Sequence, residues 1–478
     1  MRSLVLSWFA FFCCVSVVSG QAPVAKKPVS FIADVAPILK ENCFACHDSK
    51  KRSGKYDMTS YEKIVAGGIN GEAVVKGKLA ESDLHGLMVT KEERRMPPRE
   101  KGEAVPAAKA AIIATWITEG AKLDSGLDPK ADLLKELRQR WTPPPVPEAF
   151  SKPIVVNALA FTPDGQSIVV GGHHELTVWN AKDGKLQKRI STRTERAYGL
   201  AFLADGSLIV AGSRPGQEGS VRAYNLKAKP AKAVNGVEWL DGVNDPAVLL
   251  ASWLETDDSV LCLAISADGK FVAAGGCDRT VRVWNASAGA KAAKLEQTIE
   301  NHADWVLGVA FTPDGKLLLS ASRDKTAKVW DLQAKESVLT FPDHQNQVFA
   351  VASKLDSTLG YSVGADKQLR SWKPDGDGKQ VKNTGGHNDD VYKIVANPKE
   401  PLLATASADR TVKLWDVEKL QATKTLTGLT DFVYTVAFSA DGQFVAAGSY
   451  LGEVAVWNVK DKADKPVLLF NATPGLKR

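Results

Sequence analysis

The apolar residues of this chain follow three patterns, each confined to one part of the sequence. A continuous apolar run occupies residues 4–18. Over residues 28–123, apolar positions return every three or four residues, as at Val35 and Ile38, which predicts amphipathic helices. Over residues 154–478, apolar and polar residues alternate in short runs between turn sequences, which predicts strands. We therefore expect a multidomain protein, with a small all-α domain followed by a larger all-β domain.

The first apolar run is typical of a secretory signal peptide. Arg2 supplies a positive start, and the small residues Ser19 and Gly20 stand before Gln21, so cleavage is expected after Gly20. The run is too short for a comfortable membrane span, although an uncleaved anchor is the alternative. No later segment of the sequence approaches a membrane span. We therefore expect an exported protein, periplasmic or in an equivalent compartment, whose mature chain does not cross a membrane.

The helical region is expected to contain two flanking helices. One precedes the cysteine pair described below, and the second starts at Pro106 and ends near Gly120, since proline favours a first turn and glycine a helix end. A short helix and a proline-rich linker are expected over residues 124–153. The prolines between Trp141 and Pro147 predict a stiff, extended spacer before the strands begin.

The strongest chemical motif is the run Cys43-Phe44-Ala45-Cys46-His47. This C-x-x-C-H spacing indicates c-type haem attachment. Residues three apart share a helix face, so Cys43 and Cys46 can reach the two vinyl groups of one haem, and His47 then offers an imidazole to the iron. A zinc site would need about four ligands, and a thioredoxin-like motif would need a βαβ context. We therefore expect one covalent haem c with His47 as proximal ligand.

The candidates for the sixth iron ligand are Met58, His85, Met88 and Met96. Met96 precedes Pro97 and Pro98, which hold the chain extended and cannot donate backbone hydrogen bonds. A thioether on such a stiff loop can face the iron opposite His47. His/Met ligation raises the reduction potential and closes the iron to substrates, which favours electron transfer. His85 and Met88 fall in a predicted surface helix over residues 82–88.

Residues 31–123 resemble the planctomycete-type cytochrome c domain. The segments that carry the resemblance are Asp34-Val35-Ala36-Pro37-Ile38-Leu39, Asn42-Cys43-Phe44-Ala45-Cys46-His47, Met96-Pro97-Pro98 and Trp116-Ile117-Thr118-Glu119-Gly120-Ala121. The resemblance implies haem c with His47 and Met96 as axial ligands.

The remainder of the chain repeats itself. Alternating strands end in an aromatic residue at Trp179, Tyr224, Trp284, Trp330, Trp372, Trp415 and Trp457. Most gaps are 42 to 46 residues, which is typical of WD40 propeller blades, and the seven aromatics predict a seven-bladed propeller over residues 154–478. The gap between Tyr224 and Trp284 is 60 residues, which predicts an insertion around residues 226–258. Its Trp239 and Trp253 either bind a partner or cap the blade.

Three histidines, His302, His344 and His387, stand 28 residues before a repeat tryptophan. In WD repeats such a histidine belongs to a structural His–Asp–Ser–Trp network. We expect the set to be completed by Ser322 with Asp324 and by Ser407 with Asp409. The fifth repeat keeps Asp366 but has Gly364 at the expected serine position. These histidines are therefore expected to hold loops rather than a metal.

Charge and cysteine content narrow the functional classes. The net charge of +6 is too weak to indicate a nucleic-acid partner. The mature chain keeps Cys43, Cys46, Cys262 and Cys277, which is no disulfide framework for this length, and a pairing of the last two stays open. Ring closure also stays open, with residues 467–470 as an outer strand or residues near Ile154 as a latch.

We therefore expect an exported cytochrome that transfers electrons through its haem to an unidentified protein redox partner, with the propeller as a protein-binding scaffold. The alternative is a multi-cofactor redox enzyme with its catalytic site in or on the propeller. Only five histidines lie in the propeller sequence, and three of them belong to the expected structural network. An electron-transfer protein is accordingly favoured over a catalyst.

Overall fold

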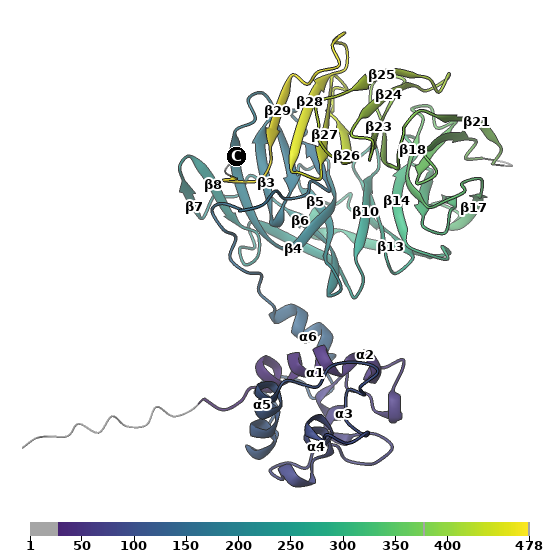
Figure 1. Cartoon of the computed structure of the whole chain (residues 1–478). Helices are drawn as coiled ribbons and strands as arrows, with labels where there is room; N and C mark the ends of the chain where they lie inside the picture. Colours follow the sequence, from purple (N-terminus) through teal and green to yellow (C-terminus); the bar gives the residue numbers. More distant parts are fainter. Residues whose placement is uncertain (1–26, 376–377, 477–478) are drawn as a thin grey trace, which may run out of the picture. The chain divides into compact units, whose positions relative to one another are not determined.

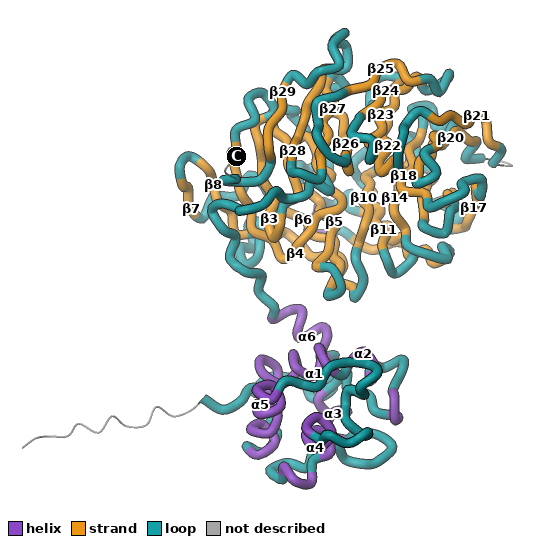
Figure 2. The backbone as a smooth tube through the Cα atoms, viewed as in Figure 1, coloured by secondary structure: helices purple, strands orange, loops and turns teal. Residues whose placement is uncertain are grey.

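Two units make up the chain, Met1–Trp141 and Thr142–Arg478. The structure, a computed structural model, describes residues 27–375 and 378–476. The expected signal peptide, with its cleavage after Gly20, lies outside the described residues. The α-helices described belong to the first unit and the strands to the second (Figures 1 and 2). This confirms the predicted order of a small helical domain and a larger all-β domain.

The first unit begins with one turn of π-helix, Phe31–Val35, which is capped by the Ser30 side chain. Its α-helices are α1 (Ala36–Asn42), α2 (Phe44–His47), α3 (Tyr61–Ala66), α4 (Asp83–Val89), α5 (Ala107–Thr118) and α6 (Leu133–Arg140). Helix α5 ends just before Gly120, whose φ of 97° is accessible at low cost to glycine alone. The predicted helix start and end near Pro106 and Gly120 are confirmed.

Three aromatic rings pack the segment before α1 against α3 and α5. The Phe31 ring lies 5.1 Å from that of Tyr61 and 5.3 Å from that of Trp116. The hydroxyl of Tyr61 donates to the Ala121 carbonyl at 2.6 Å, and the Trp116 indole donates to the Lys122 carbonyl at 2.9 Å. Each buried ring therefore combines apolar contact with a satisfied polar group. The segment before α1 is fixed against α3 and α5, and this fixes the direction in which α1 leads into the cysteine motif.

Within the described residues, the second unit contains seven blades. Five are separate four-stranded antiparallel sheets, and blades 1 and 2 share one long strand within a single nine-stranded sheet. The strands, blade by blade, are β1 (Leu159–Phe161), β2 (Ser167–Gly171), β3 (His173–Asn180) and the first part of β4 (Leu186–Phe202); the last part of β4, β5 (Leu208–Arg214), β6 (Glu218–Tyr224) and β9 (Leu249–Thr256); β10 (Val260–Ile265), β11 (Phe271–Gly276), β12 (Thr280–Asn285) and β13 (Lys294–Glu300); β14 (Val306–Phe311), β15 (Leu317–Ser322), β16 (Ala327–Asp331) and β17 (Glu336–Phe341); β18 (Val348–Ser353), β19 (Gly360–Gly364), β20 (Gln368–Trp372) and β21 (Gln380–Gly385); β22 (Val391–Ala396), β23 (Leu402–Ser407), β24 (Val412–Asp416) and β25 (Ala422–Leu426); and β26 (Val433–Phe438), β27 (Phe444–Ser449), β28 (Glu453–Asn458) and β29 (Leu468–Asn471).

The insertion is shorter than the sequence indicated. Strand β9 is the ordinary outer strand of blade 2, so the extra segment is confined to the short hairpin β7 (Lys232–Val234) and β8 (Val237–Asp241). Strand β8 pairs in parallel with β4 and adds a strand to the outer edge of blade 1. Trp239 lies 4.3 Å from the Arg189 guanidinium, and Trp253 donates to the Ala290 carbonyl at 2.9 Å. Both tryptophans are therefore used in packing the blades.

The hydroxyl of the WD network is not the one predicted. Ser320 bonds to the His302 imidazole at 2.8 Å and accepts from the Trp330 indole at 2.9 Å. The other ring nitrogen of His302 lies 2.8 Å from the Asp324 carboxylate, as predicted. Ser322 instead donates to the Asp304 carbonyl. Because residues two apart in a strand point to the same face, the sequence pattern alone does not separate these two serines.

The same correction applies to the next two blades. Ser362 joins His344 to Trp372, so the fifth blade is complete and its Gly364 replaces nothing. In the sixth blade Thr405, and not Ser407, joins His387 to Trp415. All three histidines are bonded through both ring nitrogens to protein groups.

Main-chain hydrogen bonds close the ring between the last blade and the first. Strand β29 is the outer strand of blade 7, so the C-terminal sequence completes that blade. The residues before β1 bond to blade 7. The Val156 N–H donates to the Ser449 carbonyl at 3.1 Å, and the Ile154 N–H donates to the Thr473 hydroxyl at 2.9 Å. Both predicted elements of closure are thus present. The thiols of Cys262 and Cys277 are free.

Arg189 attaches the end of the proline-rich segment to blade 1. Its guanidinium donates to the carbonyls of Pro147 and Glu148 at 2.8 and 2.9 Å and forms a bidentate ion pair with Glu175, at 2.7 and 2.9 Å. The Arg189 and Glu175 side chains are almost fully buried. Within the second unit, the predicted spacer is therefore fixed from Pro147 onward.

We predict that Ser320 and Trp330 are energetically coupled, whereas Ser322 and Trp330 are not. S320A removes the acceptor of a buried indole N–H and should cost about 1–3 kcal/mol. A double-mutant cycle of S320A with W330F, measured by urea unfolding with far-UV circular dichroism, should give a coupling of about 0.5–3 kcal/mol. The same cycle with S322A is the matched control and should give a coupling near zero. Equal coupling in the two cycles would contradict the hydrogen bonds seen here.

The same networks predict an acid-sensitive propeller. Burial opposes ionisation of Asp324, but hydrogen bonds from His302 and Thr326 outweigh it and hold its pKa well below the usual value. The pKa values of Asp366 and Asp409 are lowered in the same way. A depressed folded-state pKa contributes stability that is complete above the unfolded value of about 3.9 and is lost as the pH falls through the folded value.

Unfolding free energy should therefore fall as the pH drops below about 4, and a D324N/D366N/D409N variant should show a shallower fall over the same range. The measurement is urea unfolding at a series of pH values. Parallel curves for the variant and the wild type would show that these carboxylates do not control acid sensitivity.

Candidate functional site

The cysteine motif lies at a break between two short helices. Cys43 ends α1, where its N–H donates to the Leu39 carbonyl at 2.8 Å, and its φ of −126° departs from helical geometry. Helix α2 then resumes, with the N–H groups of Cys46 and His47 both 3.1 Å from the Cys43 carbonyl. The two cysteines therefore stand on one turn, and His47 is the last helical residue.

Tyr56 orients the His47 imidazole. Nδ1 of His47 lies 3.3 Å from the Tyr56 carbonyl, and the two rings are 5.4 Å apart. The Tyr56 hydroxyl donates to the Ile64 carbonyl at 2.6 Å, which fixes the side chain of the residue whose main-chain carbonyl faces His47. A carbonyl bonded to Nδ1 holds the proton there and leaves the Nε2 lone pair for a metal. Sequence reasoning did not find Tyr56, since it belongs to no motif and meets His47 only in the fold.

A cavity of about 330 Å³ collects the predicted site residues. Its lining includes Cys43, Cys46, His47 and Met96, together with apolar residues such as Leu84. Small-molecule and cofactor sites are usually apolar cavities of roughly 300–1,000 Å³ with a few polar groups. Two thiols, one imidazole and a thioether on a single apolar cavity form the donor set that a covalent haem requires. The residues present therefore fit that group.

The Cys43 thiol is largely shielded from solvent and lies near Cys46. Burial, followed by the neighbouring Cys46, raises the pKa of the Cys43 thiol to about 12. Among residues 27–375 and 378–476, no group of three or more His, Cys, Asp or Glu is placed to hold a metal ion.

The structure brings three of the four sixth-ligand candidates to the cavity. Met58 and Met88 are 1% and 4% exposed and belong to the apolar core, whereas Met96 is 38% exposed. All three methionines line the cavity, and His85 is not among its lining residues. The Met58 N–H donates to the His47 carbonyl at 2.8 Å, so Met58 follows the segment of the proximal histidine.

The loop that carries Met96 is fixed on both sides. The N–H of Met96 donates to the Leu87 carbonyl at 2.8 Å, which ties the loop to α4. Arg95 donates to the Pro97 carbonyl at 3.1 Å and to the Gly102 carbonyl at 2.9 Å. A loop held in this way keeps its methionine beside the cavity without burying it in the core.

No described helix is long and apolar enough to cross a membrane.

Comparison with known proteins assigns each part of the chain. A family described as Planctomycete cytochrome C matches residues 43–100, which include the cysteine motif and Met96. The WD domain, G-beta repeat family matches residues 248–285, 293–331, 378–416 and 420–458. The second match, for example, begins before β13 and ends with β16, so a sequence repeat takes its first strand from one blade and the rest from the next.

Curated relatives resemble this chain over part of its length. The chain is 35% identical to the periodic tryptophan protein 2 homolog of Mus musculus over 203 residues, 42% of this chain and 22% of that protein. It is 29% identical to eukaryotic translation initiation factor 3 subunit I of Aspergillus fumigatus over 148 residues, 27% of this chain and 42% of that protein. It is 36% identical to the small ribosomal subunit protein RACK1 of Glycine max over 90 residues, 17% of this chain and 28% of that protein. The matches span less than half the length of each of these relatives. The chain is a fusion of a planctomycete-type cytochrome c domain with a WD40-repeat propeller.

Proposed function

We propose that this protein is an electron-transfer cytochrome with one covalent haem c. The observation that carries the proposal is the single apolar cavity that gathers Cys43, Cys46, His47 and Met96. The two cysteines would hold the haem through thioether bonds, and His47 would be the proximal ligand. When bound, the haem supplies a one-electron iron couple. The carbonyl of Tyr56 keeps the His47 ring in the tautomer and orientation that ligation requires.

Met96 is the sixth ligand that the geometry favours. It approaches the cavity on a separate, anchored loop, while Met58 follows the His47 segment itself. Met58 and Met88 also line the cavity, but both are almost fully buried in the apolar core, and moving either toward an iron would leave a void behind it. Ligation by Met96 would close the iron to substrates and raise its potential, which suits electron transfer.

The propeller is proposed to bind a protein partner, since it supplies a rigid surface in the same chain as a redox domain and similar repeats occur in the WD40 relatives. His302, His344 and His387 are held by hydrogen bonds at both ring nitrogens, which leaves them no role as ligands of a second cofactor.

Export is part of the same proposal, because the apolar run at residues 4–18 is followed by small residues. The protein would then work in the periplasm or an equivalent compartment. Intact mass of the secreted protein should show a chain that starts at Gln21 and carries one haem. A chain that retains residues 1–20 would contradict the cleavage.

Covalent attachment predicts a graded loss of haem. In a host that matures cytochrome c, the wild type should show reduced haem c bands and keep its haem on a denaturing gel. The variant C43A/C46A should lose all haem stain, and each single variant should keep at most one thioether. C262A is the matched control and should stain like the wild type. Haem lost from the wild type on denaturation would refute covalent attachment, and extra chromophore bands would favour a multi-cofactor enzyme.

Ligation by Met96 predicts different results for two methionine variants of similar volume. M96L should become high-spin or bind another ligand, and its potential should fall by a fraction of the ~0.8 V range that axial ligands span. M88L also loses a thioether at the cavity but should keep the low-spin spectrum, with a stability cost below about 1.5 kcal/mol. Visible absorption and redox titration report both variants. A normal M96L spectrum together with an altered M88L spectrum would move the ligand to Met88.

A further inference from the structure

The innermost strands of the propeller surround a central cavity of about 450 Å³. Every blade contributes to its wall, and the lining includes Leu200, Leu263, Val309 and Val351. The lining continues to the turns after these strands, so the cavity lies at that end of the propeller. The wall combines polar and apolar surface in similar amounts, because the side chains of Leu263, Val309 and Val351 are themselves buried between the blades. The volume is in the range of small-molecule sites, roughly 300–1,000 Å³.

One charged side chain, Lys393, lines this central cavity. It is half-buried, and it has no hydrogen bond or ion pair within the part of the chain that the structure describes. Burial lowers the pKa of Lys393, which reflects the cost of keeping an ammonium in these surroundings. The thiol of Cys262 supplies no counter-charge, because burial raises its pKa to about 12.

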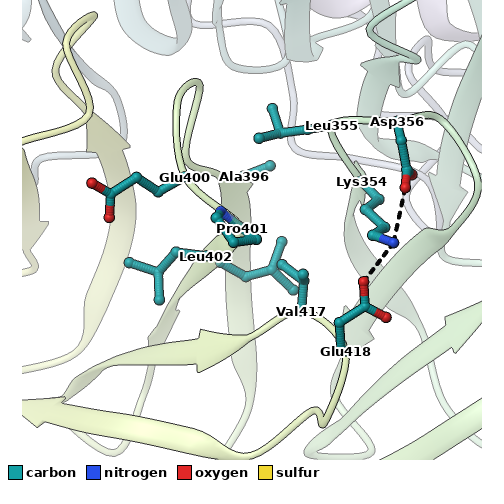
Figure 3. A pocket seen from close by; sticks show the side chains of 10 residues that line it. Lys354, Leu355, Asp356, Ala396, Glu400, Pro401, Leu402, Val417 and Glu418 are labelled. Atoms are coloured by element: carbon teal, nitrogen blue, oxygen red, sulfur yellow. Dashed lines mark ion pairs between the residues drawn. The ribbon is translucent and has the colours of Figure 1, made fainter.

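A second lysine, Lys354, lies near the same end of the propeller and forms ion pairs with two carboxylates. Lys354 lies in a neighbouring cavity, where its ammonium is 2.9 Å from the Asp356 carboxylate and 2.6 Å from that of Glu418 (Figure 3). Both lysine side chains are at least partly buried, so the two residues differ in their ion pairs and not in their burial. Lys354 needs no ligand, and Lys393 lacks an anion.

The local backbone explains how a long side chain fits in the central cavity. The pairing of β22 with β23 shifts register between Val391 and Lys393, and the same shift occurs in the inner strands of the neighbouring blades. The residues that follow the shift there are Ala350 and Thr435. Because these neighbours are small, space remains beside Lys393 at the corresponding level of the ring.

We propose that the central cavity binds a small organic monoanion, with its carboxylate at Lys393 and its apolar body against the surrounding wall. A single ammonium balances one negative charge, so a monocarboxylate fits better than a phosphate dianion. Half-buried apolar side chains of the wall, such as Leu200 and Ile265, supply contacts for an aliphatic or aromatic body. The site belongs to the propeller, and it is independent of haem binding in the first unit.

The test uses the full-length protein with its haem and decanoate as the probe, measured by isothermal titration calorimetry. Wild-type protein should bind decanoate more tightly than 1-decanol, which has the same chain but no charge. K393M replaces the ammonium by a thioether of similar length and should weaken decanoate binding about 10- to 100-fold, the range expected for one charged hydrogen bond. The affinity for 1-decanol should be unchanged or improved.

K354M is the matched control, because it removes a paired lysine near the same end and should leave decanoate binding intact. Circular dichroism confirms that each variant folds, and loss of a buried charge makes unfolding of K393M unexpected. Equal decanoate affinity in K393M and wild type would overturn the proposal, as would equal binding of decanoate and decanol by the wild type. Decanoate binding lost equally in K354M would place the site in the neighbouring cavity instead.

Discussion

A four-stranded blade has two apolar faces and can bury both only between two neighbours, so the whole second unit depends on a closed ring. The join between blades 7 and 1 is made by main-chain groups: Val156 donates to Ser449, and Phe150 donates to Pro474. Each sequence repeat covers parts of two blades, so the chain also connects neighbouring blades around the ring. Strand β4 shows the extreme case, since one continuous strand belongs to blades 1 and 2.

The blades could be predicted because their spacing is carried by local sequence. The aromatic residue that ends each third strand recurs with the repeat, and it gave the right number and order of blades. The choice between Ser320 and Ser322 failed because both side chains point to one face of β15, and only the approach of His302 decides between them. The insertion was set too long because the repeat aromatics mark third strands only, so their spacing does not separate the outer strand Leu249–Thr256 from the extra residues before it.

The candidate haem site could also be predicted only in part from the sequence. Cys43, Cys46 and His47 are close together in the sequence, so a five-residue motif is sufficient to find them. Tyr56 and the packing of Met58 depend on how separate segments meet, and no local pattern records that meeting. The cavity is lined by the three methionine candidates and not by His85, and sequence spacing alone could not place these methionines together.

The contact between Arg189 and the end of the linker is made to main-chain carbonyls, which are the same for every amino acid. Residues 147 and 148 can therefore change identity over evolutionary time without loss of this attachment. An added or deleted residue between them and β1 would move both carbonyls away from a guanidinium that Glu175 and Trp239 hold in place. Related chains should accordingly vary the linker length before Pro147 and keep a constant number of residues after it.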